Sequence, residues 1–270
     1  MVQQLSLFSV IDDGSYDLCI STLSALSGLP PIIFSNFSMV SMPNQSYDIE
    51  RVNSKNQLIE QCRIKACCPV PLDRLLANDV PKDYKAMKKL QEDDISGFDM
   101  PYFQNLLAKA QDPDAMLTDD SDESQVSWTL SISDIPSAGN NRKVSMQTIT
   151  ESTVASIGGT STSILSFLTQ LGYVQDFQHL TAGVKYNMSH GVVLELSKVW
   201  KIHDGKTTQI TKGGYLVKAY VNVQKGTDIK RINRGVQSLC ALQKELNGYI
   251  DLEVPDRKAM DSRIDNLDTL

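Results

Sequence analysis

Apolar and polar residues alternate along several stretches of the chain, which is the pattern of strands with one buried face. A hairpin is the clearest case, because residues 184–188 and 192–196 alternate on either side of a Ser189-His190-Gly191 turn. On alternation, or on β-branched and aromatic content, further strands are predicted over residues 2–8, 32–42, 128–132, 144–148, 215–223 and 249–254. The pattern therefore predicts a chain dominated by β-structure.

Other stretches repeat apolar residues every three or four positions, which predicts helices. The longer ones cover residues 15–28, 162–171 and 229–246, and a short one carries Tyr84, Met87 and Leu90. Gly28 is placed to end the first helix, and the Pro30-Pro31 pair prevents its continuation. Eight or more strands with three or four helices predict an antiparallel meander that closes into a barrel or packs as a sandwich, since closure removes exposed edges.

One stretch of the chain holds the excess negative charge. The 270 residues have a formal net charge of −6, whereas residues 92–123 contain ten acids and one base, so that this stretch is −9 and the remainder +3. Residues 112–125 have too little apolar content to fold, and a disordered acidic insertion is predicted at about 110–125. We expect a single domain over residues 1–270, with no membrane span, because no apolar run approaches the roughly 18 residues that one needs.

The sequence lacks the usual motifs of catalysis and metal binding. A phosphate loop would need glycine where Trp200 stands, and the three histidines are too far apart for a compact ligand set. The five cysteines lack CxxC spacing, so free thiols are expected. Asp251 and Glu253 form the one pair of acids on a predicted strand face, where solvation is the simplest expectation. We predict no catalytic residue, no cofactor and no metal.

Two basic clusters have simple interpretations. Lysines at four positions between 82 and 89 share one side of the short predicted helix. They could meet an acidic partner or the acidic segment of this chain, but a plain exposed face is the simpler expectation. Lys230, Arg231 and Arg234 form a cluster that is too small for a nucleic-acid surface. Direct binding of nucleic acid is therefore not expected.

Several segments together resemble one known family, Mediator subunit 18 of the head module of the RNA polymerase II Mediator complex. The segments lie in order along the chain, at residues 2–8, 17–28, 46–60, 130–148, 209–233 and 245–263. The resemblance implies a mainly β fold, an antiparallel β-barrel with a few flanking helices. It also implies a non-enzymatic nuclear coregulator of transcription that pairs with a related barrel, Mediator subunit 20, and is tethered by a helix of Mediator subunit 8.

The same type of barrel resembles that of metal-dependent triphosphate tunnel enzymes, which makes a triphosphate hydrolase the alternative function. Such enzymes hold a divalent cation with Glu-x-Glu pairs on several strands. No predicted strand has this pattern. The positions that the resemblance implies to face inward are apolar and unsuited to a hard cation: Val184, Tyr186, Leu194, Leu196, Val217 and Ala219.

The first predicted helix has two apolar sides where an ordinary surface helix has one. The first side consists of Tyr16, Cys19, Leu23 and Leu26. The second side contains smaller residues and consists of Leu18, Thr22, Ala25 and Leu29. We predict that one side packs on the barrel of this chain and the second binds the related partner barrel; the alternative is a helix buried wholly within this chain.

Overall fold

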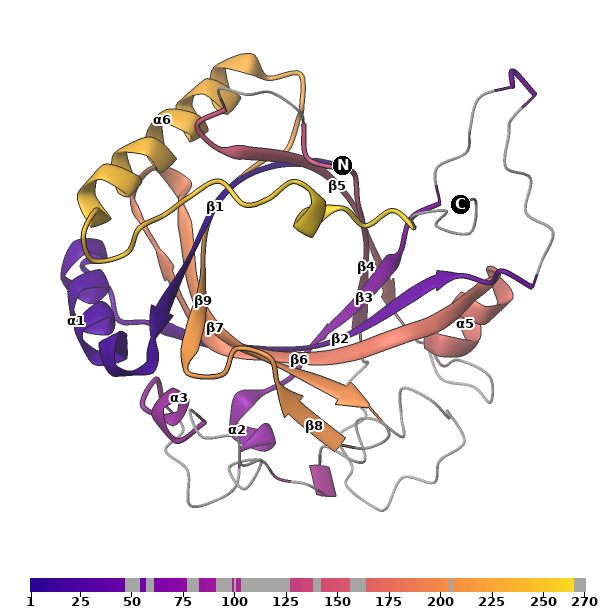
Figure 1. Ribbon diagram of the computed structural model, residues 1–270, viewed down its shortest axis with the longest axis horizontal. Coiled ribbons are helices and arrows are strands. Elements are labelled where there is room, and N and C mark those ends of the chain that lie inside the picture. Colours follow the sequence, from indigo (N-terminus) through magenta and orange to yellow (C-terminus); the bar gives the residue numbers. More distant parts are fainter. Residues whose placement is uncertain are drawn as a thin grey trace.

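The strands form one antiparallel sheet that closes into a barrel (Figure 1). The computed structural model describes residues 1–46, 54–56, 61–76, 83–90, 99, 101–102, 127–137, 142–155, 164–203 and 206–264. Its strands are β1 (Val2–Asp12), β2 (Ile32–Pro43), β3 (Ile64–Pro69), β4 (Ser127–Ser133), β5 (Ser145–Ala155), β6 (Tyr173–Asn187), β7 (Val193–His203), β8 (Lys206–Gln209) and β9 (Gly214–Val223). The mainly β barrel that the sequence predicts is therefore confirmed.

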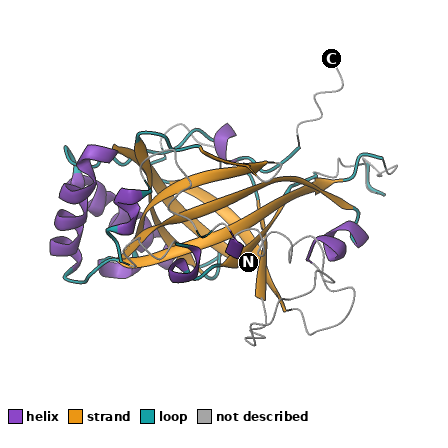
Figure 2. Cartoon of the chain, turned by 90° about the horizontal axis from the view of Figure 1, so that it is seen from below, coloured by secondary structure: helices purple, strands orange, loops and turns teal. Residues whose placement is uncertain are grey.

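Helices lie outside the strands, several of them gathered at one end of the barrel (Figure 2). The α-helices are α1 (Tyr16–Ser27), α2 (Leu72–Leu75), α3 (Ala86–Lys89), α5 (Ile164–Gln170) and α6 (Ile229–Leu246). The short 3-10 helices are η1 (Asp13–Ser15), η3 (Ser189–Gly191) and η4 (Lys258–Met260). Within the described part of the chain, no helix has the length and apolar character needed to cross a membrane.

The order of strands around the barrel differs from a simple meander. Eight strands follow one another as β6-β2-β3-β4-β5-β1-β9-β7, and β7 closes the ring by pairing with β6. Strand β8 continues the edge of β7 beyond the end of β9. The meander is correct for β2, β3, β4 and β5 and for the β6–β7 hairpin. It is wrong for β1, which lies between β5 and β9, and for the second neighbour of β2, which is β6.

Two strand predictions need correction. Residues 249–254 do not form a strand; they contribute one isolated bridge, in which Glu253 pairs with Phe8 beside the short free edge of β1. Pro255 follows at once and cannot continue a ladder. Strand β3 was not predicted, because its six residues contain only three buried positions, too few for a clear period.

The main hydrophobic core lies between the outer surface of the barrel and the helices. Helix α6 packs so closely that a Cβ on Gly235 would lie 2.7 Å from Leu5 Cδ1 and 3.3 Å from Val221 Cγ1. Leu5 and Val221 therefore point outward. Side chains alternate along each strand, and the register then places the other buried positions of these strands on the same outer face.

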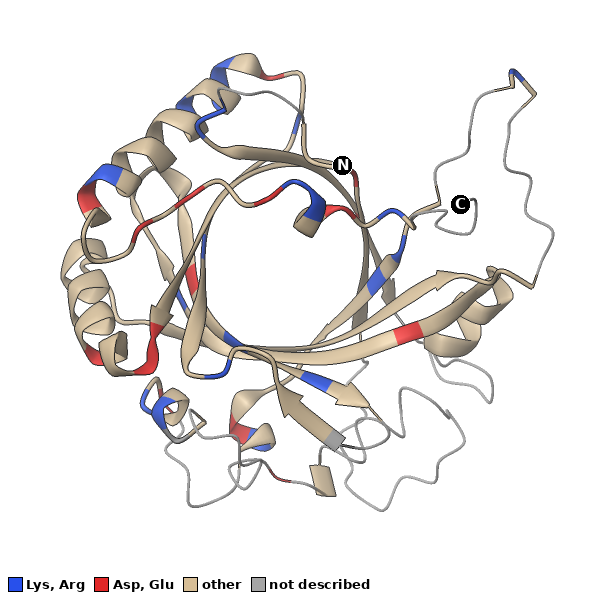
Figure 3. Ribbon diagram, viewed as in Figure 1, with Lys and Arg blue, Asp and Glu red and all other residues tan. Residues whose placement is uncertain are grey.

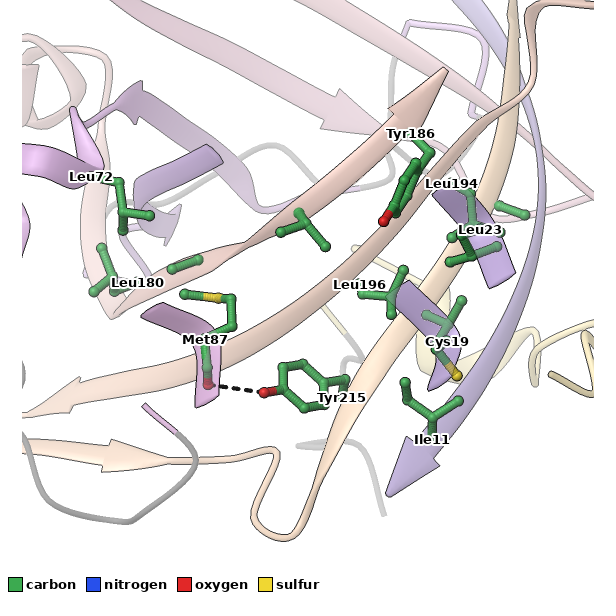
Figure 4. Packing of buried hydrophobic residues seen from close by; sticks show 14 of the residues in the cluster. Ile11, Cys19, Leu23, Leu72, Met87, Leu180, Tyr186, Leu194, Leu196 and Tyr215 are labelled. Carbon is green, nitrogen blue, oxygen red and sulfur yellow. Dashed lines mark hydrogen bonds between the residues drawn. The ribbon is translucent and has the colours of Figure 1, made fainter. Parts of the chain in front are cut away.

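This geometry reverses the predicted direction of six side chains. Val184, Tyr186, Leu194, Leu196, Val217 and Ala219 are buried, as apolar residues should be, but they face outward. Figure 4 shows Tyr186, Leu194 and Leu196 against Cys19 and Leu23 of helix α1. The prediction of an apolar interior is therefore wrong, because the helices rather than the barrel interior cover the apolar positions.

Gly183 occupies a point where β6 and β7 approach each other closely. A Cβ at this position would lie 2.1 Å from the backbone oxygen of Leu196. We expect Gly183→Ala to lower the free energy of unfolding by about 1 to 3 kcal/mol, the usual cost of overpacking, measured by urea unfolding. Gly14→Ala is the matched control, since its Cβ would meet only Asp12 at an ordinary 3.7 Å. Equal midpoints for the two variants would contradict this account.

Candidate functional site

Helix α1 carries the candidate interface, and its ends are defined by local chemistry. Gly28 adopts the left-handed conformation at φ 67° and ends the helix, as the sequence predicts. Before the helix, the Asp12 carboxylate accepts a hydrogen bond of 2.7 Å from the backbone N–H of Ser15. The chain therefore leaves β1 and enters α1 in a fixed direction.

The inner side of α1 packs on the barrel wall through apolar contacts, and tyrosines add ring stacking and a hydrogen bond. Tyr16, Cys19, Ile20 and Leu23 are buried. The ring of Tyr16 stacks on that of Tyr215 with 4.6 Å between centroids. The Tyr186 hydroxyl donates a hydrogen bond of 3.1 Å to the backbone oxygen of Ile20. This side of the helix packs on its own barrel, as expected.

The outer side of α1 exposes apolar side chains to solvent. Leu18 is 59% exposed, and Ala25 is also exposed. Leu29, which was predicted to continue this side, is 54% exposed but lies beyond the end of the helix, because Gly28 turns the chain out of the helical path. Thr22 is half-buried. Leu26, which was predicted on the inner side with Tyr16, Cys19 and Leu23, is 38% exposed and lies in the last turn of the helix. Leu26 therefore adds to the outer row.

A buried ion pair anchors the start of α1. Lys198 has no solvent exposure, and its Nζ lies 2.9 Å from an oxygen of Asp13 in η1. The same ammonium donates a hydrogen bond of 3.1 Å to the backbone oxygen of Gly214 and lies 4.6 Å from the centroid of the Tyr215 ring. The importance of Lys198 was not predicted from the sequence. A signal was present, because every second residue from 194 to 202 is buried and Lys198 is one of these positions.

A second, exposed ion pair connects α1 to α3. The ammonium of Lys88 contacts the carboxylate of Asp17. The predicted lysine cluster therefore meets an acid of its own chain at this position, while Lys85 is exposed. Lys82 and the side chain of Lys89 lie outside the described residues.

The barrel interior contains charges of both signs. Register and alternation place Lys218, Glu195, Lys65 and Glu151 on the inward face of β9, β7, β3 and β5. Tyr220 donates a hydrogen bond of 2.8 Å to Oε1 of Glu195. Burial lowers the pKa of Lys218 to about 8, and the charge of Glu195 opposes this shift. Figure 3 shows basic and acidic positions interspersed around the strands.

The described residues contain no group of three or more histidine, cysteine, aspartate or glutamate side chains placed to hold a metal. His179 is on the inward face of β6, and burial lowers its pKa to about 4, so that it is neutral at pH 7. His190 occupies the predicted turn at φ 60°. The carboxylate of Asp251 accepts a hydrogen bond of 3.1 Å from the backbone N–H of Gly248.

Other predicted features stand as follows. The acidic insertion that the sequence predicts at about 110–125 lies outside the described residues. All five cysteines are free thiols. Lys230, Arg231 and Arg234 are exposed at the start of α6, where Arg231 forms an ion pair of 3.3 Å with Asp228.

Comparison with known proteins gives consistent matches. The family model described as Med18 protein matches residues 3–263. Mediator of RNA polymerase II transcription subunit 18 from Saccharomyces cerevisiae is 43% identical over 300 residues, which cover 98% of this chain and 98% of that protein. The corresponding subunit from Kluyveromyces lactis is 45% identical over 272 residues, which cover 99% and 100%.

A solved structure shows the same fold. In the structure of the Schizosaccharomyces pombe Mediator head module, one chain superposes with a TM-score of 0.60 at 11% sequence identity. The match covers 94% of this chain and 98% of that chain. The barrel and its flanking helices are therefore shared over nearly the full length of both.

Proposed function

The chain belongs to the Mediator subunit 18 family, and on this premise we propose that it is a non-enzymatic subunit of the Mediator head module. It would act in the nucleus as a coregulator of RNA polymerase II transcription, through contacts with other proteins. The names of its relatives and the fold shared with a chain of a Mediator head module support this function.

One observation supports the choice of contact surface: the outer side of α1 exposes Leu18 and Ala25, and the exposed Leu29 follows directly after the Gly28 cap, whereas the inner side packs on the barrel. Apolar, uncharged surface is typical of the centre of a protein interface. Small side chains such as Ala25 allow a partner backbone to approach. We assign this outer row, with Thr22 at its edge, to Mediator subunit 20, a related barrel.

Mediator subunit 8 would contribute a helix that tethers the pair to the rest of the head. The outer row of α1 is short, about three helical turns, and the related barrel would occupy it. The helix of subunit 8 therefore needs a different surface of this chain.

The barrel interior argues against the alternative of a metal-dependent triphosphate hydrolase. Glu151 and Glu195 both face inward, but Lys65 and Lys218 accompany them, and Glu195 already accepts a hydrogen bond from Tyr220. Lys185 of β6, directly opposite Glu195, faces inward as well. Two carboxylates accompanied by at least three ammonium groups do not attract a hard divalent cation, which prefers several oxygen ligands. This interior therefore favours a scaffold.

We expect no release of phosphate from ATP or from 5′-triphosphorylated RNA with Mg²⁺ or Mn²⁺, measured on the purified full chain. Any trace activity should be unchanged in Glu151→Gln and Glu195→Gln, because it would come from a contaminant. Turnover that both substitutions abolish would contradict the scaffold function.

The most direct test of the proposed function is purification of the tagged full chain from cells, followed by identification of the proteins that accompany it. Other Mediator head subunits, with subunits 20 and 8 among them, are the expected result. Recovery of the chain without any Mediator subunit would overturn the proposal.

A further inference from the structure

Helix α6 has an outer face that carries only positive charge. Residues 229–244 contain four basic residues and no acid, although the whole chain has a net charge of −6. Three of the four, Lys230, Arg234 and Lys244, are exposed on the side of the helix opposite to its buried residues and are called the basic row below. The fourth, Arg231, is exposed at the edge of this face. Figure 3 shows basic positions recurring along α6.

Two members of the basic row have no counter-charge. Arg231, at the edge of the face, forms an ion pair of 3.3 Å with Asp228. Within the part of the chain that the structure describes, neither Lys230 nor Arg234 forms an ion pair. Their charges are therefore available to an acid of another molecule.

The position of these cations is unfavourable for the helix itself. The N-terminal end of a helix is the positive end of its dipole, so that acids stabilise the first turn and cations destabilise it. In α6 the first turn contains no acid but holds Lys230 and Arg231, and the capping Asp228 offsets only part of this cost. Arg234 lies four residues after Lys230 and three after Arg231, so that it repels both. The stability of α6 therefore does not explain why cations occupy these positions, whereas recognition of an anion does.

We propose that the basic row binds an acidic helical segment of a partner protein. The row is about 21 Å long from Lys230 to Lys244, because a helix rises about 1.5 Å per residue. Between the charges lie Gln237 and Ala241, which are exposed and uncharged, and the small Ala241 lets a second helix lie alongside. Acids on successive turns of that helix would meet the cations of the row. This contact is separate from the pairing proposed for α1 and gives the chain a second protein partner.

The charges favour protein over nucleic acid as the occupant of the basic row. Three cations neutralise few phosphates, and a chain with a net charge of −6 repels a long polyanion. A short acidic segment avoids most of this repulsion, because it brings few charges beyond those that the row neutralises.

The test is a fluorescence anisotropy titration of the full chain against a fluorescein-labelled peptide of about 20 residues, with glutamate at every fourth position and alanine and glutamine elsewhere. Saturable binding is expected at low salt, and it should weaken as sodium chloride is added, because salt screens exposed charges. Arg234→Glu and Lys230→Glu should each raise the Kd by about fivefold or more. Lys85→Glu makes the same change of charge at an exposed lysine beside α3 and should leave the Kd nearly unchanged.

Urea unfolding separates lost binding from lost folding. Lys230→Glu places an acid in the first turn of α6 and removes the repulsion from Arg234, so that the unfolding midpoint should not fall. Absence of saturable binding, or equal Kd values for Lys85→Glu and both α6 variants, would overturn the proposal. Tighter binding of a single-stranded DNA of equal charge, weakened by the same two substitutions, would also overturn it and assign the row to nucleic acid.

Discussion

Asp13→Ala should lower the free energy of unfolding by about 3 kcal/mol. The substitution leaves the ammonium of Lys198, which has no solvent exposure, without its counter-charge at 2.9 Å. A buried charge that loses its partner costs far more than an exposed one. Urea unfolding measures the loss, and local loosening of α1 should accompany it.

The chain offers a matched control for this prediction. Asp17→Ala removes the other aspartate that pairs with a lysine near α1, but Asp17 and Lys88 are both largely exposed, so its cost should stay below about 1 kcal/mol. The double variant Asp13→Ala/Lys198→Met should recover much of the stability, because it removes both charges. Equal losses for Asp13→Ala and Asp17→Ala would contradict the account of the anchor.

Strong local patterns made most of the fold predictable. The hairpin around His190 and the helix that ends at Gly28 combine a clear period with a residue suited to a left-handed conformation, and both are present. The order of the strands was harder to predict from the sequence, because the pairing of β1 with β9 joins residues about 210 positions apart. Nothing in local periodicity specifies such a pairing.

The direction of the side chains was the main failure of prediction. Alternation shows that Leu194 and Leu196 share one face, but it does not say whether that face is turned toward the barrel interior or toward a helix. The covering helix decides this, through contacts such as that of Gly235 with Leu5. For the same reason the sequence did not reveal that Lys198 is buried outside the barrel while Lys218 lies within it.

Ala25→Trp should weaken pairing with Mediator subunit 20 by about 1 to 3 kcal/mol, which corresponds to a rise in Kd of roughly 5- to 150-fold. Ala25 is exposed on the outer side of α1, so a large side chain there leaves the isolated fold intact but overpacks the proposed contact. Thr22→Ile acts in the same direction but is a less clean test, because Thr22 is half-buried.

The measurement that tests the central claim most directly is a titration of subunit 20 against the wild-type chain, Ala25→Trp and Ala241→Trp. Ala241 is an exposed alanine on α6, outside the proposed contact, and provides the matched control. The interface account predicts weaker binding for Ala25→Trp alone, with unchanged circular dichroism for all three proteins. Wild-type affinity of a folded Ala25→Trp, or equal losses for both variants, would contradict the claim that this chain acts through the outer side of α1.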